Sequence, residues 1–126
     1  MTIPVTLLYG SLTALLLGLL GVNVSRMRVA KRAYVGAAPD PELQRAIRAH
    51  GNAAEWVPML ILLLLLLELI GASGMVLHVL GGTILASRLG HAIGLLAKLR
   101  IGALAATVTF LLAVGMPIYV LVLRFH

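Results

Sequence analysis

The chain has 126 residues, of which 61% are hydrophobic and 11% are charged, and its mean hydropathy is +1.08. A soluble domain of this length could not bury so much apolar surface, because small domains have a high ratio of surface to volume, so we expect lipid to surround most of the chain. The absence of cysteine excludes disulfides and thiolate sites, and the net charge of +6, carried by basic residues that flank apolar runs, favours anionic lipid headgroups or a small anionic ligand over nucleic acid as partner.

The first predicted membrane span covers about residues 4–24. No Lys or Arg precedes Leu7, and the charges follow the apolar stretch, so we interpret this segment as a retained membrane helix rather than a cleavable signal. A basic loop over about residues 26–40 is expected to follow. It begins with four cations, Arg26, Arg28, Lys31 and Arg32.

The second predicted helix runs from about Pro41 to Ile70, because Asp40 followed by Pro41 is the pattern of a helix N-cap. At 1.5 Å per residue this helix is roughly 45 Å long, against a hydrocarbon core of roughly 30 Å. Its first turns must therefore protrude, and the span itself covers about residues 53–70. Pro58 is expected to kink the helix, since proline removes a backbone hydrogen bond.

A tight turn is predicted at residues 71–74 (GASG), and two further spans cover about residues 75–96 and 101–123. With four spans, the two basic connections lie on one side of the membrane. The positive-inside rule places that side in the cytoplasm and both termini outside. Glu68 and His78 can pair with each other across the turn.

Three polar residues of the second helix, Arg48, Asn52 and Glu55, are spaced i, i+4, i+7 and share one helix face. Ionisable groups within a membrane cost roughly 2.5–3.5 kcal/mol each unless they are satisfied. One explanation is structural, with Arg48 reaching headgroups while the other two bond to neighbouring helices. The other is a pocket that holds carboxylates and an ammonium group, which suits a zwitterionic, peptide-like ligand.

Arg88 and His91 lie at i, i+3 on the third helix, at the same predicted depth as Glu55. Matching depth favours one shared site. A buried salt bridge between Arg88 and Glu55 is the structural alternative. Lys98 and Arg100 fall at the membrane surface, where topological anchoring is their ordinary role. The scattered histidines do not have the spacing of a metal site.

The stretch RAIRAHGNAAEWVP (45–58) resembles the second-helix signature of the MAPEG superfamily, the membrane-associated proteins of eicosanoid and glutathione metabolism. The signature is an Arg, an Asn four residues on, a Glu three further and a Pro soon after. Residues 88–100 are similar to the third helix of the prostaglandin E synthases of this superfamily, and residues 27–34 are similar to the end of the first helix. The resemblance covers essentially the whole chain, 1–126, as a single domain.

The resemblance implies an all-α membrane protein, a bundle of four transmembrane helices that forms a homotrimer. It also implies three glutathione sites at the subunit interfaces, near the cytoplasmic face. The residues implied in glutathione binding are Arg45, Arg48, Asn52, Glu55, Arg88 and His91, with Arg28 or Lys31 from a neighbouring subunit. Active members carry an arginine near the start of the fourth helix that stabilises the glutathione thiolate, and Arg100 is the candidate for this catalytic role.

Three positions depart from the family pattern. Trp56 replaces a tyrosine or other aromatic after the Glu. Leu95 stands where members often carry a tyrosine, and an ungapped alignment with the prostaglandin synthase puts Leu104 at the catalytic position; a short gap brings Arg100 there. We expect a bacterial inner-membrane glutathione transferase or peroxidase-like enzyme for lipophilic electrophiles or lipid hydroperoxides. The alternative is a non-catalytic lipid-binding or scaffold member of the same fold. A small cation exporter is disfavoured, because the first span contains no acidic residue.

Overall fold

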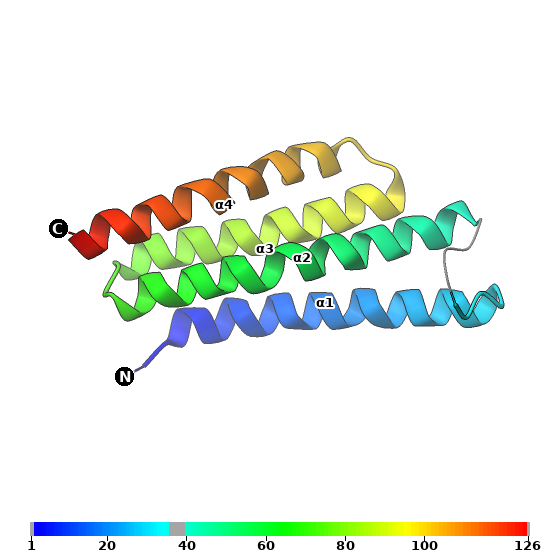
Figure 1. Cartoon of the computed structure of the whole chain (residues 1–126), viewed down its shortest axis with the longest axis horizontal. Coiled ribbons are helices and arrows are strands. Elements are labelled where there is room, and N and C mark those ends of the chain that lie inside the picture. Colours follow the sequence, from blue (N-terminus) through cyan, green and yellow to red (C-terminus); the bar gives the residue numbers. More distant parts are fainter. Residues whose placement is uncertain (1, 36–39, 126) are drawn as a thin grey trace.

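A computed structural model describes residues 2–35 and 40–125 as a bundle of four long helices (Figure 1). The two described ranges contain no strand. Each helix is long and apolar enough to cross a membrane, which confirms the predicted all-α membrane fold. The helices are α1 (Pro4–Ala30), α2 (Pro41–Leu69), α3 (Gly74–Ala97) and α4 (Ile101–Phe125).

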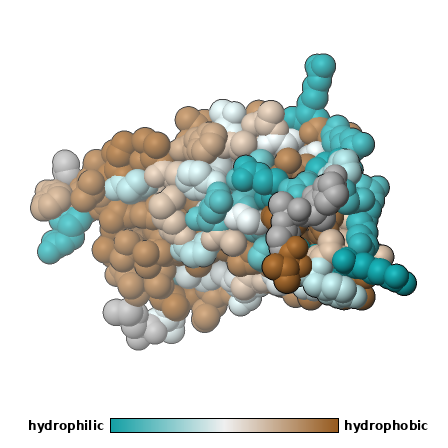
Figure 2. Space-filling model, turned by 45° about the vertical axis from the view of Figure 1, so that its right-hand side comes forward, coloured by the Kyte–Doolittle hydropathy of each residue, from teal (hydrophilic) through white to brown (hydrophobic). Residues whose placement is uncertain are grey.

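The α1–α2 and α3–α4 connections lie at one end of the bundle, and the start of α1, the α2–α3 turn and the end of α4 lie at the other (Figure 1). Hydrophilic residues gather at the first of these ends, while the rest of the visible surface is largely hydrophobic (Figure 2). The bundle therefore has one basic, water-facing end and an apolar body. We call the first the basic end.

The first helix is longer than the predicted span. It stays helical past Arg26 and Arg28 to Ala30, so the predicted basic loop of residues 26–40 begins later than expected. Hydropathy marks where a helix leaves the lipid, whereas backbone hydrogen bonding continues until Arg32, whose φ of 52° ends the helical path. Residues 36–39 of the predicted loop lie outside the described residues.

The predicted N-cap of α2 is confirmed. The Asp40 carboxylate accepts hydrogen bonds from the backbone N–H groups of Glu42 (3.0 Å) and Leu43 (2.9 Å), which otherwise lack partners at a helix start. Its other oxygen lies 2.6 Å from the Lys31 Nζ, which also lies 3.0 Å from a Glu42 oxygen. The Lys31 hydrogen bond holds the pKa of the Asp40 carboxyl below its ordinary value. These contacts fasten the end of α1 to the start of α2.

The opposite end is fastened by another carboxylate. Glu68 of α2 accepts hydrogen bonds from the N–H groups of Val5 (2.9 Å) and Thr6 (2.7 Å), so it caps α1, whose own N-cap residue makes no side-chain bond. His78 instead has its Nδ1 3.3 Å from the Tyr9 hydroxyl. Glu68 and His78 therefore make no direct hydrogen bond or ion pair within the described residues, because each side chain bonds to α1 instead. They still attract each other electrostatically.

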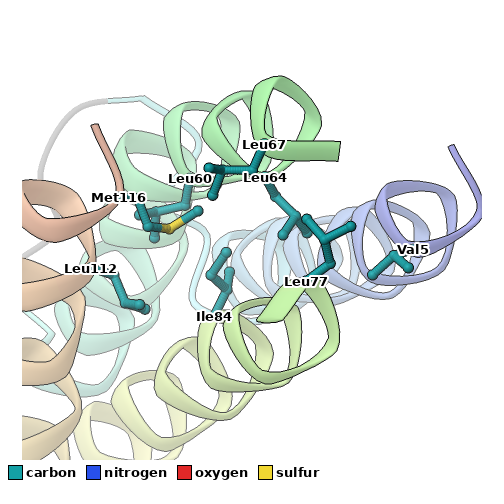
Figure 3. Packing of buried hydrophobic residues seen from close by; sticks show 8 residues of the cluster. All are labelled: Val5, Leu60, Leu64, Leu67, Leu77, Ile84, Leu112 and Met116. Carbon is teal, nitrogen blue, oxygen red and sulfur yellow. The ribbon is translucent and has the colours of Figure 1, made fainter. Parts of the chain in front are cut away.

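The helices α2 and α3 are central. Helix α1 packs on both of them, α4 also packs on both, and the backbones of α1 and α4 are not adjacent. One face of α2, continuous through Pro58, supplies core leucines that meet apolar side chains of the other three helices (Figure 3). In lipid such a face is held by close packing rather than by exclusion of water. The core residues are Val5, Leu60, Leu64, Leu67, Leu77, Ile84, Leu112 and Met116.

Two glycines of α3 allow close approach of the neighbouring helices. A methyl group at Gly81 would overlap the ring of Tyr9 on α1. A methyl group at Gly94 would overlap the backbone of Gly102 at the start of α4. Small residues at these two positions therefore set the distances between α3 and both of its outer neighbours.

Candidate functional site

Arg88 joins three helices near the basic end of the bundle. Its side chain is buried, and its Nη1 donates a hydrogen bond to the Asn52 Oδ1 of α2 at 2.8 Å. Its Nη2 donates to the Thr109 hydroxyl of α4. The Thr109 hydroxyl in turn donates to the Ala105 carbonyl at 2.9 Å, and it also lies 3.4 Å from the Ser87 hydroxyl. Two of the predicted site residues, Asn52 and Arg88, are thus in direct contact.

The structural alternative for Arg88, a salt bridge to Glu55, is wrong. Within residues 2–35 and 40–125 the only ion pairs are those of Lys31 with Asp40 and Glu42. An α-helix turns about 100° per residue, so Asn52 is rotated about 40° from Arg48 and about 60° from Glu55. This rotation is enough to turn Asn52 toward α3 while Glu55 stays outside.

Arg48 and Glu55 consequently form an exposed edge of α2, beside the half-buried Asn52. Neither has a hydrogen bond or ion pair with any residue that the structure describes. A cation and an anion are therefore available on one surface, directly next to an amide that is already held in place by Arg88. Such a surface can bind a ligand that carries both carboxylate and ammonium groups.

His91 is half-buried one turn beyond Arg88, and its Nδ1 lies 3.1 Å from the Gly102 carbonyl oxygen. Because a carbonyl only accepts, Nδ1 is the donor, and the Nε2 of a neutral ring remains an acceptor. Leu95, one further turn along α3, is also half-buried. The contact with Gly102 orients the His91 ring and leaves its second nitrogen free for a ligand.

Arg100, the candidate catalytic residue, is exposed in the connection between α3 and α4. Its side chain makes no hydrogen bond or ion pair inside the described part of the chain, although its backbone carbonyl accepts a hydrogen bond from the Ala103 N–H at 3.1 Å. Leu104, one turn into α4, is 66% exposed. Both positions competing for the catalytic role therefore face outward, where a second subunit or a ligand can reach them.

The remaining predicted site residues lie elsewhere at the basic end. Arg28 donates from its Nη1 to the Ala33 carbonyl at 3.0 Å, and Lys31 holds the two carboxylates described above. Arg45 is half-buried and lines a pocket with residues of α1 and α3. Among the predicted site residues, Asn52 and Arg88 are thus the pair that the described part of the chain shows in direct contact.

Thr109 is the site residue that the sequence interpretation missed. It is 1% exposed in a largely apolar helix. A hydroxyl in lipid needs a partner, which is a signal for a polar contact with another helix, but the sequence alone does not say which helix supplies it. Ser87, next to Arg88, is the second such residue.

Two apolar grooves run between α3 and α4. One has a volume of about 420 Å³ and lies toward the α2–α3 turn. The other, about 600 Å³, is bounded by small residues of α3 and by Ile101, Leu104 and Val108 of α4, and Ser87 also lines it. The grooves share Thr83 and Val108, so they lie next to each other along the surface, and we call the two together the apolar channel.

Comparison with known proteins matches the MAPEG family to residues 6–122. The inner membrane protein YecN of Escherichia coli strain K12 is 43% identical over 90 residues, which are 71% of this chain and 69% of YecN. YecN of Escherichia coli O6:H1 matches to the same extent. The four apolar helices and these relatives agree on an integral inner-membrane location.

Proposed function

Because the chain belongs to the MAPEG family, we propose that it is an inner-membrane enzyme that uses the thiolate of glutathione on lipophilic electrophiles or lipid hydroperoxides. The observation that carries this proposal is the exposed pair of Arg48 and Glu55 beside the fixed amide of Asn52. Glutathione offers two carboxylates and one ammonium group, which match this set in charge and hydrogen bonding. Arg88 contributes indirectly, because the hydrogen bond that it donates holds the side-chain oxygen of Asn52 in place.

The site needs a second subunit to enclose the ligand. We propose a homotrimer in which the exposed edge of α2 faces the basic end of α1 in the neighbouring chain, on the cytoplasmic side. Lys31 pairs with two carboxylates of its own chain, whereas Arg28 bonds to the Ala33 carbonyl and has a guanidinium with five donors, so we assign the contact across the interface to Arg28. A basic residue at that point would hold a glycine or glutamyl carboxylate of the tripeptide.

The chemistry requires a thiolate. A thiol with a pKa of about 8.5 is mostly protonated at neutral pH, and a nearby guanidinium favours its ionised form. We assign this role to Arg100. The thiol proton leaves to water at the membrane surface. The thiolate sulfur then bonds to the electrophilic carbon, and the leaving group departs with its electron pair. A lipophilic substrate would approach from the bilayer through the apolar channel between α3 and α4.

Glutathione binding tests this proposal. The purified protein in lipid nanodiscs is titrated with glutathione by calorimetry, and conjugation of a generic aryl halide is followed by absorbance. We expect Glu55→Gln to weaken binding by about ten- to hundredfold, because a hydrogen bond to a charged group contributes about 1.5–3 kcal/mol. Arg124→Gln, at the opposite end of the bundle, is the matched control and should bind as the parent does. Lack of binding at millimolar glutathione would overturn the proposal.

A second candidate is a non-catalytic lipid-binding member of the same fold. Leu95 and Leu104 favour it, since leucine offers no group that can stabilise a thiolate. Glutathione binding without conjugation of the aryl halide would select this candidate. Turnover that falls in Arg100→Ala, with unchanged glutathione affinity, would select the enzyme and place Arg100 at the thiol.

A further inference from the structure

A third pocket, of about 290 Å³, opens at the basic end between α1, α2 and α3. Its lining mixes basic and apolar side chains, unlike the channel between α3 and α4. The family resemblance implies Arg45 in glutathione binding, but Arg45 lines this pocket, which does not include Arg48 or Glu55. The lining residues are Asn23, Arg26, Met27, Glu42, Arg45 and Leu96.

The pocket carries two guanidinium groups with unused donors. Arg26 donates one hydrogen bond from its Nη2 to the Asn23 Oδ1 at 3.1 Å. Arg45, half-buried, has no hydrogen bond or ion pair with any described residue. The single carboxylate of the lining, Glu42, already lies 3.0 Å from the Lys31 Nζ. The pocket therefore presents excess positive charge that its own chain does not neutralise.

We propose that this pocket binds a phosphate group, held by Arg26 and Arg45. The planar guanidinium fork matches phosphate oxygens in a bidentate arrangement, and donors from two helices can surround one such group. The lining residues come from the basic end of helices that are long and apolar enough to cross a membrane, where we expect phospholipid headgroups to lie. Met27 and Leu96 give it an apolar wall. This combination suits the phosphodiester of an anionic phospholipid, with free phosphate as the other source of the same chemistry.

The test compares lipids that differ in net charge. Protein in micelles containing equal amounts of phosphatidylglycerol and phosphatidylcholine is examined by native mass spectrometry, and the bound lipids are counted. We expect a preference for phosphatidylglycerol that falls about fivefold for each arginine removed, the effect of one basic residue near an anionic surface. The variants are Arg26→Gln, Arg45→Gln and the double variant. Circular dichroism checks that each stays helical.

Lys98→Gly is the matched control. It removes a cation from the same end but outside the pocket, and glycine suits the positive φ of 59° at that position. A second arm measures the thermal shift caused by inorganic phosphate, against chloride at equal ionic strength, in phosphatidylcholine micelles. A phosphate shift that needs Arg26 and Arg45, without lipid preference, identifies the free anion as the ligand.

Two results would overturn the proposal. The double variant could retain the parent's lipid preference and its phosphate shift, in which case the two arginines hold no phosphate. Alternatively, Lys98→Gly could lose as much of the preference as the arginine variants do, in which case the attraction belongs to the whole basic end. Retained preference in Lys98→Gly, with loss in both arginine variants, supports the assigned pocket.

Discussion

Arg88 connects α2, α3 and α4 through two hydrogen bonds, to Asn52 and to Thr109. A buried cation in a membrane is costly unless its donors are satisfied, so each partner of Arg88 contributes to stability as well as to the position of Asn52. The proposed glutathione surface therefore depends on a residue of α4 that lies outside it. This dependence can be measured at Thr109, where one hydroxyl can be removed at constant side-chain volume.

We expect Thr109→Val to lower the free energy of unfolding by about 1–2 kcal/mol, because it leaves a buried guanidinium donor without its acceptor. Thr107→Val is the control on the same helix. The Thr107 side chain is exposed and bonds only to the Ala103 carbonyl of its own helix, so its loss should change stability by less than about 0.5 kcal/mol. Unfolding in mixed micelles, followed by circular dichroism, gives both values. Equal effects of the two variants would contradict this role of Thr109.

At the residue scale, the sequence predicted which polar residues matter better than it predicted their partners. The i, i+4, i+7 spacing placed Arg48, Asn52 and Glu55 together on one side of α2. It could not show that a rotation of about 60° sends Asn52 to Arg88 and leaves Glu55 exposed. Whether Arg88 meets a partner such as Thr109 depends on how each helix is rotated about its own axis. The periodicity of the sequence does not determine that rotation.

The contact between α1 and α3 depends on one glycine. Gly81→Ala should lower the free energy of unfolding by about 1–3 kcal/mol, because the added methyl group overlaps the Tyr9 ring and forces the helices apart. The neighbouring Gly82→Ala is the control, since its methyl group would lie 3.7 Å from the Tyr9 hydroxyl, an ordinary contact. Alanine's better helix propensity, worth up to about 1 kcal/mol, should leave that variant as stable as the parent or more so. Thermal unfolding in micelles compares the pair, and a reversed order would contradict the packing described.

The start of α2 should respond to acid. The pKa of Asp40 is lowered in the folded chain, so its contribution to stability is complete above its ordinary pKa and is lost as the pH falls through the lowered value. Asp40→Asn keeps an oxygen for the cap but cannot pair with Lys31 as an anion. We expect this variant to melt at a lower temperature at neutral pH, and to lose less of its melting temperature on acidification than the parent loses.

Ser73→Ala is the control that removes a helix N-cap without removing a charge. Ser73 accepts a hydrogen bond from the Val76 N–H at the start of α3 and carries no titrating group in this pH range. The Ser73→Ala protein should melt below the parent by a similar amount at all pH values, so its melting temperature should keep the pH dependence of the parent. An Asp40→Asn protein with the full acid dependence of the parent would show that Asp40 does not cause it.

For the whole molecule, four long apolar runs and the placement of basic residues were sufficient to predict the helix order and the shared end of the two basic connections. Lipid requires each spanning segment to satisfy its own backbone, which leaves few alternatives to a helical bundle. The predicted end of α1 came too early, because the apolar stretch ends before the backbone hydrogen bonding of the helix does. The exposed Arg48 and Glu55 are the feature that one chain by itself leaves unexplained, and they motivate the proposed trimer.

Subunit mixing tests that trimer directly. If Glu55 of one chain and Arg28 of its neighbour hold the same glutathione, Glu55→Gln and Arg28→Gln proteins should each conjugate poorly when they are prepared alone. Coexpressed in equal amounts, they should form trimers in which roughly one quarter of the sites have both native residues, since each of the two chains is of the required kind half of the time. Conjugation activity should then exceed the sum of the separate preparations. Coexpression of Glu55→Gln with Glu55→Gln, Arg28→Gln is the control, because no site in that mixture recovers a native Glu55. Activity that stays at the level of the separate variants would place both residues in the site of a single chain and contradict a ligand held between subunits.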